Sequence, residues 1–101
     1  MKLKFRKQAM NPRELIRRCG YGEGRNPRDG VFSYTRRLGG NPYPHFHVYI
    51  DELPDAFVFN IHLDQKKPSY GGSSAHNGEY DGELVRAEAR RLIESVGGYI
   101  K

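Results

Sequence analysis

Two neighbouring segments of the chain alternate regularly between apolar and polar residues, as strands do when they bury one face. They span residues 45–51 and 56–64, and residues 52–55 fit a hairpin loop between them. Burying one large apolar side chain stabilises a fold by about 1.5–3 kcal/mol, so the apolar side of this hairpin is expected to face the core. That side consists of Phe46, Val48, Ile50, Phe57, Phe59, Ile61 and Leu63.

One helix is predicted on each side of the strands along the chain. Asn11 can cap a helix that begins at Pro12, and Gly20 can end it. Residues 81–96 have the spacing of a second, amphipathic helix. Its apolar face is expected to contain Val85, Ala89, Leu92, Ile93 and Val96.

A third strand is expected at residues 31–38, which are rich in β-forming side chains. The predicted fold is α+β, with two layers: a three-stranded antiparallel sheet with an N-terminal and a C-terminal helix packed on one face, in α-β-β-β-α order. A length of 101 residues predicts a single domain over 1–101. Residues 1–10 form either a basic arm or an edge strand. Residues 65–80 form a long loop, either a lid or binding loop or a plain connector.

This order of elements is similar to that of the double-stranded RNA-binding domain, and the resemblance is one of topology only. In that family a lysine cluster at the start of the last helix grips phosphates. The matching stretch here is Glu79-Tyr80-Asp81-Gly82-Glu83. Acidic groups at this position repel phosphate, so the function of that family is not carried across.

The net charge of +5 is distributed unevenly along the chain. Residues 1–43 carry a net charge of +8, and residues 44–101 carry −3. A basic segment of this kind indicates a polyanionic partner, and it predicts a small nucleic-acid-binding module, with RNA as the favoured ligand. An acidic protein partner stays open, as does a surplus of charge that serves solubility. The residues expected to contact phosphates are Lys2, Lys4, Arg6, Lys7, Arg13, Arg17, Arg18, Arg36 and Arg37.

Strand alternation places three of the four histidines on the polar side of the predicted hairpin. A tight hairpin brings His45 close to His62 and His47 close to Asn60. The three histidines therefore converge on one open surface of the sheet.

His45, His47 and His62 are candidate ligands for a divalent metal such as zinc, because three imidazoles and an open position describe a catalytic zinc site. His76 or Asp64 can supply a fourth ligand. The arrangement on strands is similar to that of carbonic anhydrase. It gives the alternative function, a metal-dependent hydrolase or nuclease. Strand histidines also occur without a metal, and they can contact phosphates or stack on bases instead.

Two features of the sequence bear on location. No run of about 18 apolar residues exists, and the basic N-terminus lacks the apolar stretch of a secretory signal. Cys19 is the only cysteine, so no internal disulfide can form. A cytoplasmic protein without a membrane span is expected.

Overall fold

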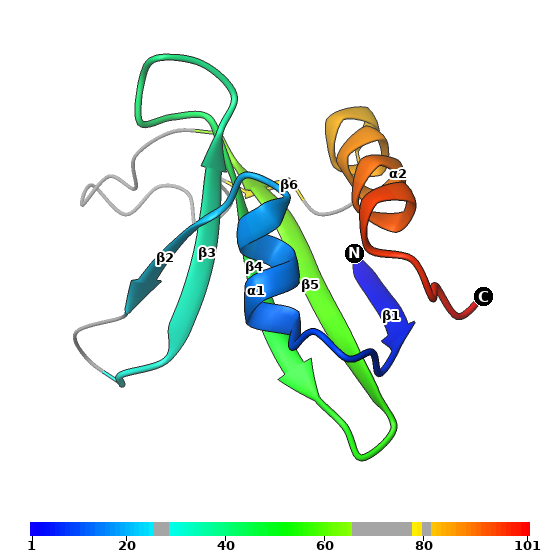
Figure 1. The fold of residues 1–101 in the computed structure, drawn as a ribbon. Helices are drawn as coiled ribbons and strands as arrows, with labels where there is room; N and C mark the ends of the chain where they lie inside the picture. The colour runs from blue at the N-terminus through cyan, green and yellow to red at the C-terminus, as the bar shows by residue number, and fades with distance from the viewer. Residues whose placement is uncertain (26–28, 66–77, 80–81) are drawn as a thin grey trace.

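The computed structural model describes residues 1–25, 29–65, 78–79 and 82–101. Within these residues the helices are α1 (Pro12–Arg18) and α2 (Glu83–Val96). The strands are β1 (Lys2–Arg6), β2 (Gly22–Arg25), β3 (Phe32–Arg37), β4 (His45–Glu52), β5 (Ala56–Asp64) and β6 (Gly78–Glu79). They form one antiparallel sheet in the order β1-β5-β4-β3-β2, and the short β6 pairs with the end of β5 (Figure 1).

The predicted three-stranded sheet in α-β-β-β-α order is wrong, because five strands make up the main path of the sheet. Of the two interpretations of residues 1–10, the structure has the edge strand, since β1 pairs with β5. β2 was not predicted, because its Gly-Glu-Gly-Arg segment lacks β-forming side chains and forms a strand by pairing with β3. These extra strands also depart from the order on which the resemblance to the double-stranded RNA-binding domain rested.

The segment predicted as a long loop at residues 65–80 contains β6. Most of the predicted lid, binding loop or connector, residues 66–77 and 80–81, lies outside the described residues. The second helix begins at Glu83 with Gly82 as its N-cap, slightly later than the predicted 81–96.

Local signals at the first helix act as predicted. The side chain of Asn11 accepts a hydrogen bond from the backbone N–H of Glu14 at 2.9 Å, and Pro12 occupies the first turn. The buried side chain of Ile16 joins the core, and Gly20 adopts a positive φ of 96° after the last turn.

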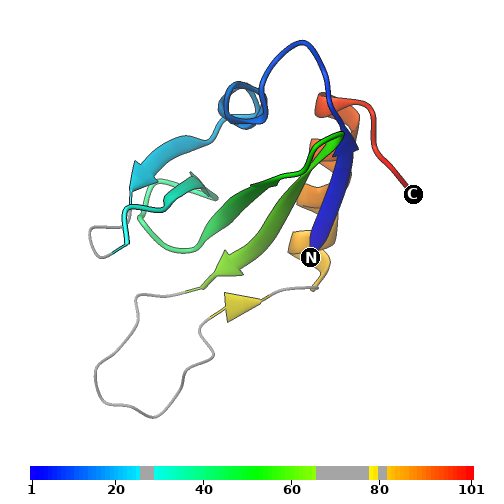
Figure 2. The ribbon, with the colours of Figure 1, turned by 90° about the horizontal axis from the view of Figure 1, so that it is seen from below.

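The core lies between the sheet and the two helices, which cover the same face of it (Figure 2). As predicted, the apolar side of the β4–β5 hairpin faces inward, and Phe59 and Ile61 are almost fully buried. Phe5 of β1 stacks on this layer, with its ring centroid 5.4 Å from that of Phe57. The opposite face of the sheet carries no described helix.

A buried carboxylate ties α2 to the sheet. Glu88 is 3 % exposed, and its oxygens accept hydrogen bonds from Arg36 of β3 at 3.0 Å, from Arg91 at 2.7 and 2.8 Å and from the Tyr21 hydroxyl at 2.6 Å. Burial by itself would raise the pKa of Glu88, but these three partners outweigh it and lower the pKa to about 2. Burial, supported by the bond to Glu88, raises the pKa of Tyr21.

Neither α1 nor α2 is long and apolar enough to cross a membrane, and this finding applies to the described residues.

Candidate functional site

The register of the central hairpin decides which polar side chains meet on the open face. His47 lies opposite His62, and His45 lies opposite Asp64. The predicted pairing of His45 with His62 is therefore wrong by two residues, because the ladder continues to a tighter turn in which Leu53 N–H donates to the Ala56 carbonyl at 2.8 Å. A shift of two residues leaves every side chain on its predicted face.

Asp64 is the centre of the resulting group. Its Oδ2 lies 3.0 Å from Nε2 of His45 and 3.2 Å from Nδ1 of His47, and its Oδ1 lies 3.1 Å from Nε2 of His62. We call these four residues the histidine–aspartate cluster. All four side chains are largely buried, with exposed fractions between 13 % and 27 %, although they project from the open face. Neighbouring rings account for part of this burial, since Tyr49 stacks on His47 at 4.7 Å.

The contacts of His45 fix where its proton lies. Its Nδ1 is 2.8 Å from the carbonyl oxygen of Pro42, and a carbonyl can only accept, so Nδ1 carries a proton and donates it. In the neutral ring Nε2 then presents a lone pair to a carboxylate oxygen of Asp64 at 3.0 Å. That contact is repulsive unless a cation lies between the two atoms, and the cation is either a proton on Nε2 or a metal ion.

His47 is the second imidazole that faces Asp64. Burial lowers its pKa, which favours the neutral ring, and burial also lowers the pKa of His62. Nδ1 of His47 faces Asp64, while its Nε2 is buried and has no hydrogen-bond partner among the described residues. Whichever nitrogen of the neutral ring carries the proton, one polar atom stays unpaired inside the protein.

The spacing of these atoms suits a shared metal ion. One ligand atom from each of His45, His47 and Asp64 lies within 4.8 Å of the other two. Metal–ligand bonds of about 2.0 Å in a tetrahedral site separate neighbouring ligand atoms by about 3.3 Å, close to the nitrogen–oxygen distances of 3.0 and 3.2 Å seen here. The hydrogen bond from His45 to the Pro42 carbonyl is the type of outer contact that orients metal-bound histidines.

Sequence reasoning named His45, His47 and His62 as a possible metal set and Asp64 or His76 as a fourth residue. The structure brings the three histidines together around Asp64. His76 lies outside the described residues.

The nine basic residues predicted to bind phosphate do not form one surface. Lys2 and Lys4 of β1 and Arg37 of β3 are exposed and share the open face with the cluster. Arg6, at the end of β1, lies on the same face by strand alternation, opposite Ala56. Lys7 is exposed just after β1, and Arg13, Arg17 and Arg18 are exposed on α1, on the opposite side of the sheet.

Two of these arginines have intramolecular partners. Arg36 points inward to Glu88, since its place in β3 puts it on the core face. Arg13 pairs with Glu23 at 3.0 Å and donates to the Tyr34 hydroxyl. Arg36 is thus part of the folded core and not of a phosphate-binding surface.

Two groups with structural roles were not predicted from the sequence: the Pro42 carbonyl, which contacts His45, and Glu88, which binds Arg36. The Pro42 carbonyl had no recognisable signal, because a backbone oxygen becomes a partner only through the path of the loop before β4. Glu88 did have a signal: it lies three residues after Val85 on the apolar side of α2, and alternation turned Arg36 inward. An acid on the apolar side of a helix and a base on the core face of a strand together predict a buried ion pair, here between Glu88 and Arg36.

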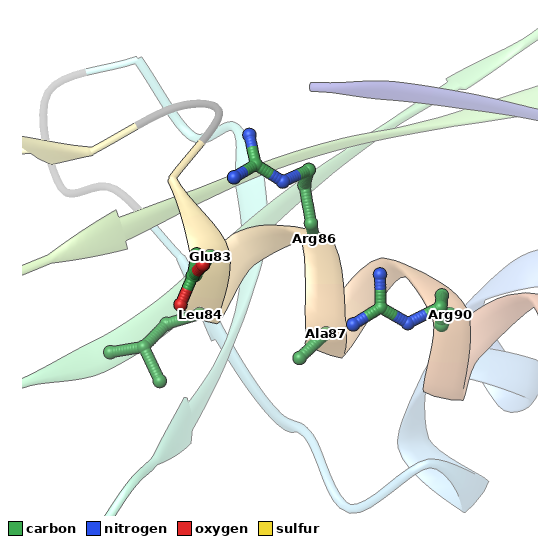
Figure 3. Close-up of a pocket in the computed structure, with 5 residues that line it drawn as sticks. All are labelled: Glu83, Leu84, Arg86, Ala87 and Arg90. Carbon is green, nitrogen blue, oxygen red and sulfur yellow. The ribbon is translucent and has the colours of Figure 1, made fainter.

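Two surface hollows, one beside the cluster and one away from it, are lined by different residues. One of about 370 Å³ lies on the outer side of α2, where Arg86 and Arg90 project from successive turns beside Glu83 (Figure 3). Another, of about 330 Å³, adjoins the cluster and includes His62 and Tyr49. Only the second shares a residue with the cluster.

Comparison with known proteins found no matching family model, no matching curated protein and no matching solved structure.

Proposed function

We propose that this protein is a metal-dependent hydrolase whose divalent metal is bound by His45, His47 and Asp64. The observation that carries the proposal is that Nε2 of His45 and Nδ1 of His47 both approach one carboxylate oxygen of Asp64, at 3.0 and 3.2 Å, so that a divalent cation could be coordinated by all three atoms. His62 faces the other oxygen of Asp64 and acts as a positioning residue, since its Nε2–H can donate to Oδ1 and orient the carboxylate.

Two nitrogen ligands and one carboxylate leave a coordination position for water, as in hydrolytic zinc sites. A divalent metal held there would lower the pKa of bound water toward about 7 and so would supply a nucleophile near neutral pH. Partial burial of the cluster strengthens the interaction of each ligand with the ion, because the surrounding rings exclude water. Zinc fits the two imidazoles and carboxylate well, and manganese is the alternative.

A second candidate function is nucleic-acid binding without chemistry, with RNA as the favoured ligand. The specific support is that Lys2, Lys4 and Arg37 share the open face of the sheet with the histidines. Such binding would weaken steeply as salt rises, whereas metal binding by the cluster would depend far less on salt.

The deciding experiment measures metal content and affinity. Purified protein is loaded with zinc or manganese, dialysed and analysed for bound metal, and its binding of cobalt is followed by visible absorption. We expect one equivalent of metal in the wild type. Asp64→Asn and His47→Ala are expected to lose it, with affinity falling at least tenfold, since each removes a ligand.

Asp51→Asn is the matched control, because Asp51 lies on the same face of the sheet but its carboxylate accepts a hydrogen bond from Asn60 and is not part of the cluster. It should bind metal as the wild type does. Metal retained by Asp64→Asn, or no binding by the wild type after loading, would refute the proposal. His62→Gln tests whether His62 positions Asp64 or is itself a metal ligand. Loss of a positioning residue should weaken metal binding, whereas loss of a ligand should abolish it.

For location we infer the cytoplasm. The inference is supported by a single cysteine, Cys19, which is buried in the core and is consistent with a reducing compartment.

A further inference from the structure

The hollow beside the histidine–aspartate cluster has a mixed lining of apolar, aromatic and polar side chains. It is lined by Met1, Lys2, Tyr49, Asn60, Ile61 and His62. His62 belongs both to this hollow and to the cluster. A molecule in the hollow would therefore lie next to the proposed metal.

Tyr49 gives the hollow a flat aromatic wall. Its side chain lies on the open face of a central strand and is 37 % exposed. The ring is nearly parallel to that of His62, with an angle of 21° at 6.2 Å, and it stacks on His47 at 28° and 4.7 Å. Fixed by two neighbours, the ring loses little freedom when a planar group stacks on it.

The positively charged side chain of Lys2 lies in the same cross-strand row as Tyr49. Lys2 of β1 is opposite Asn60 of β5, which is in turn opposite Tyr49 of β4. Lys4 lies one step further along the same face of β1. Asp51 lies one step along β4 from Tyr49, and it accepts a hydrogen bond from the Asn60 amide at 2.9 Å.

The distance from this hollow to the cluster follows from the spacing of residues along β5. Residues two apart on a strand are separated by about 6.6 Å, so Asn60, His62 and Asp64 mark successive steps along β5. A base on Tyr49 with its phosphate toward Lys2 would lie one step from His62. One nucleotide spans this distance.

We infer that this hollow binds one nucleotide of a single-stranded nucleic acid, with the base stacked on Tyr49 and the phosphate at Lys2. The inference rests on the proposed function, because it makes a phosphodiester the bond that the metal-dependent hydrolase cleaves. In that hydrolysis water oxygen bonds to phosphorus, one phosphorus–oxygen ester bond breaks, and the leaving oxygen takes up a proton. A duplex is excluded as the ligand, since its paired bases cannot stack on a side chain.

The test is a titration of a fluorescently labelled short oligothymidylate, with thymidine and inorganic phosphate as competitors and bound metal measured in the same samples. We expect the wild type to bind the oligonucleotide, and Tyr49→Ala to bind it about tenfold or more weakly, as loss of one stacked base implies. Tyr49→Phe keeps the ring and should bind like the wild type. Tyr99→Ala is the matched control, since Tyr99 is also 37 % exposed but packs on Phe5.

Lys2→Gln tests the phosphate contact. It should reduce the dependence of log affinity on log salt by about one, whereas Lys101→Gln should not. If Tyr49→Ala does not fold, Tyr49→Leu removes the aromatic face while keeping an apolar side chain. Equal binding by wild type and the Tyr49 variants, or tighter binding of a duplex of the same sequence, would overturn the inference. A wild type that holds metal but not the oligonucleotide would refute this inference alone, and oligonucleotide binding without metal would refute only the hydrolase.

Discussion

Replacement of Glu88 by glutamine tests the buried ion-pair network that ties α2 to the sheet. Glutamine keeps the shape of a protonated glutamate and removes its charge. The pKa of Glu88 is about 2 instead of its ordinary 4.5, and each pH unit of that difference is worth about 1.36 kcal/mol. The ionised side chain therefore stabilises the folded state by about 3 kcal/mol at pH 7, a large part of the 5–15 kcal/mol that is typical of a domain.

The sign of the pH dependence follows from the lowered pKa. A carboxyl whose folded-state pKa is depressed contributes its full stability above the unfolded-state pKa near 4.5, and this contribution is lost as pH falls through the folded value near 2. The difference in unfolding free energy between wild type and Glu88→Gln should thus be about 3 kcal/mol at pH 7. It should shrink to about 1.5 kcal/mol at pH 3.

Urea unfolding followed by circular dichroism at both pH values measures the difference, and urea is chosen because guanidinium would screen the ion pairs. Glu94→Gln is the matched control on the same helix, where the side chain is exposed, and it should change stability by less than about 0.5 kcal/mol. Arg36 and Arg91 are 32 % and 39 % exposed, so water can partly replace Glu88 as their partner in the variant. This replacement reduces the loss of stability. A loss below about 1 kcal/mol at pH 7, or one that does not change with pH, would show that the reasoning about this carboxylate is wrong.

The remaining predictions concern the helix cap, the core and the cluster. Asn11→Ala removes the hydrogen bond to the first turn of α1 and should lower unfolding free energy by about 1 kcal/mol, and an unchanged urea midpoint would contradict this. Phe59→Ala should cost about 3–5 kcal/mol because Phe59 is fully buried, whereas Phe32→Ala, at 39 % exposure, should cost clearly less in the same assay. Free zinc about a hundredfold above its Kd should stabilise the wild type by about 2.7 kcal/mol and raise its Tm, and Asp64→Asn should show no such rise.

Alternation along the two central strands was enough to predict which side chains share a face. The apolar side chains had to be buried together, and this requirement moved His45, His47 and His62 to the opposite surface. Alternation could not distinguish strand registers that differ by two residues, because both registers bury the same side chains. The exact turn around Leu53 made that choice, and it put Asp64 rather than His62 opposite His45.

Edge strands were the weakest part of the prediction. β2 contains two glycines in four residues, and its strand conformation depends on the ladder offered by β3. The directions of the basic side chains were not predicted, since a count of charges along the chain contains no information about which way each side chain points. Arg36 shows this most clearly, because strand position turns it into the core toward Glu88.

The sequence by itself determined the strand faces, the capped first helix, the amphipathic second helix and the gathering of three histidines on one surface, since each depends on periodicity or on neighbours a few residues apart. Only the tertiary structure decided the five-stranded order, the pairing of Arg36 with Glu88 and the position of Asp64 at the centre of the imidazoles. These features join residues far apart along the chain, and their geometry is fixed by how the whole sheet pairs and packs.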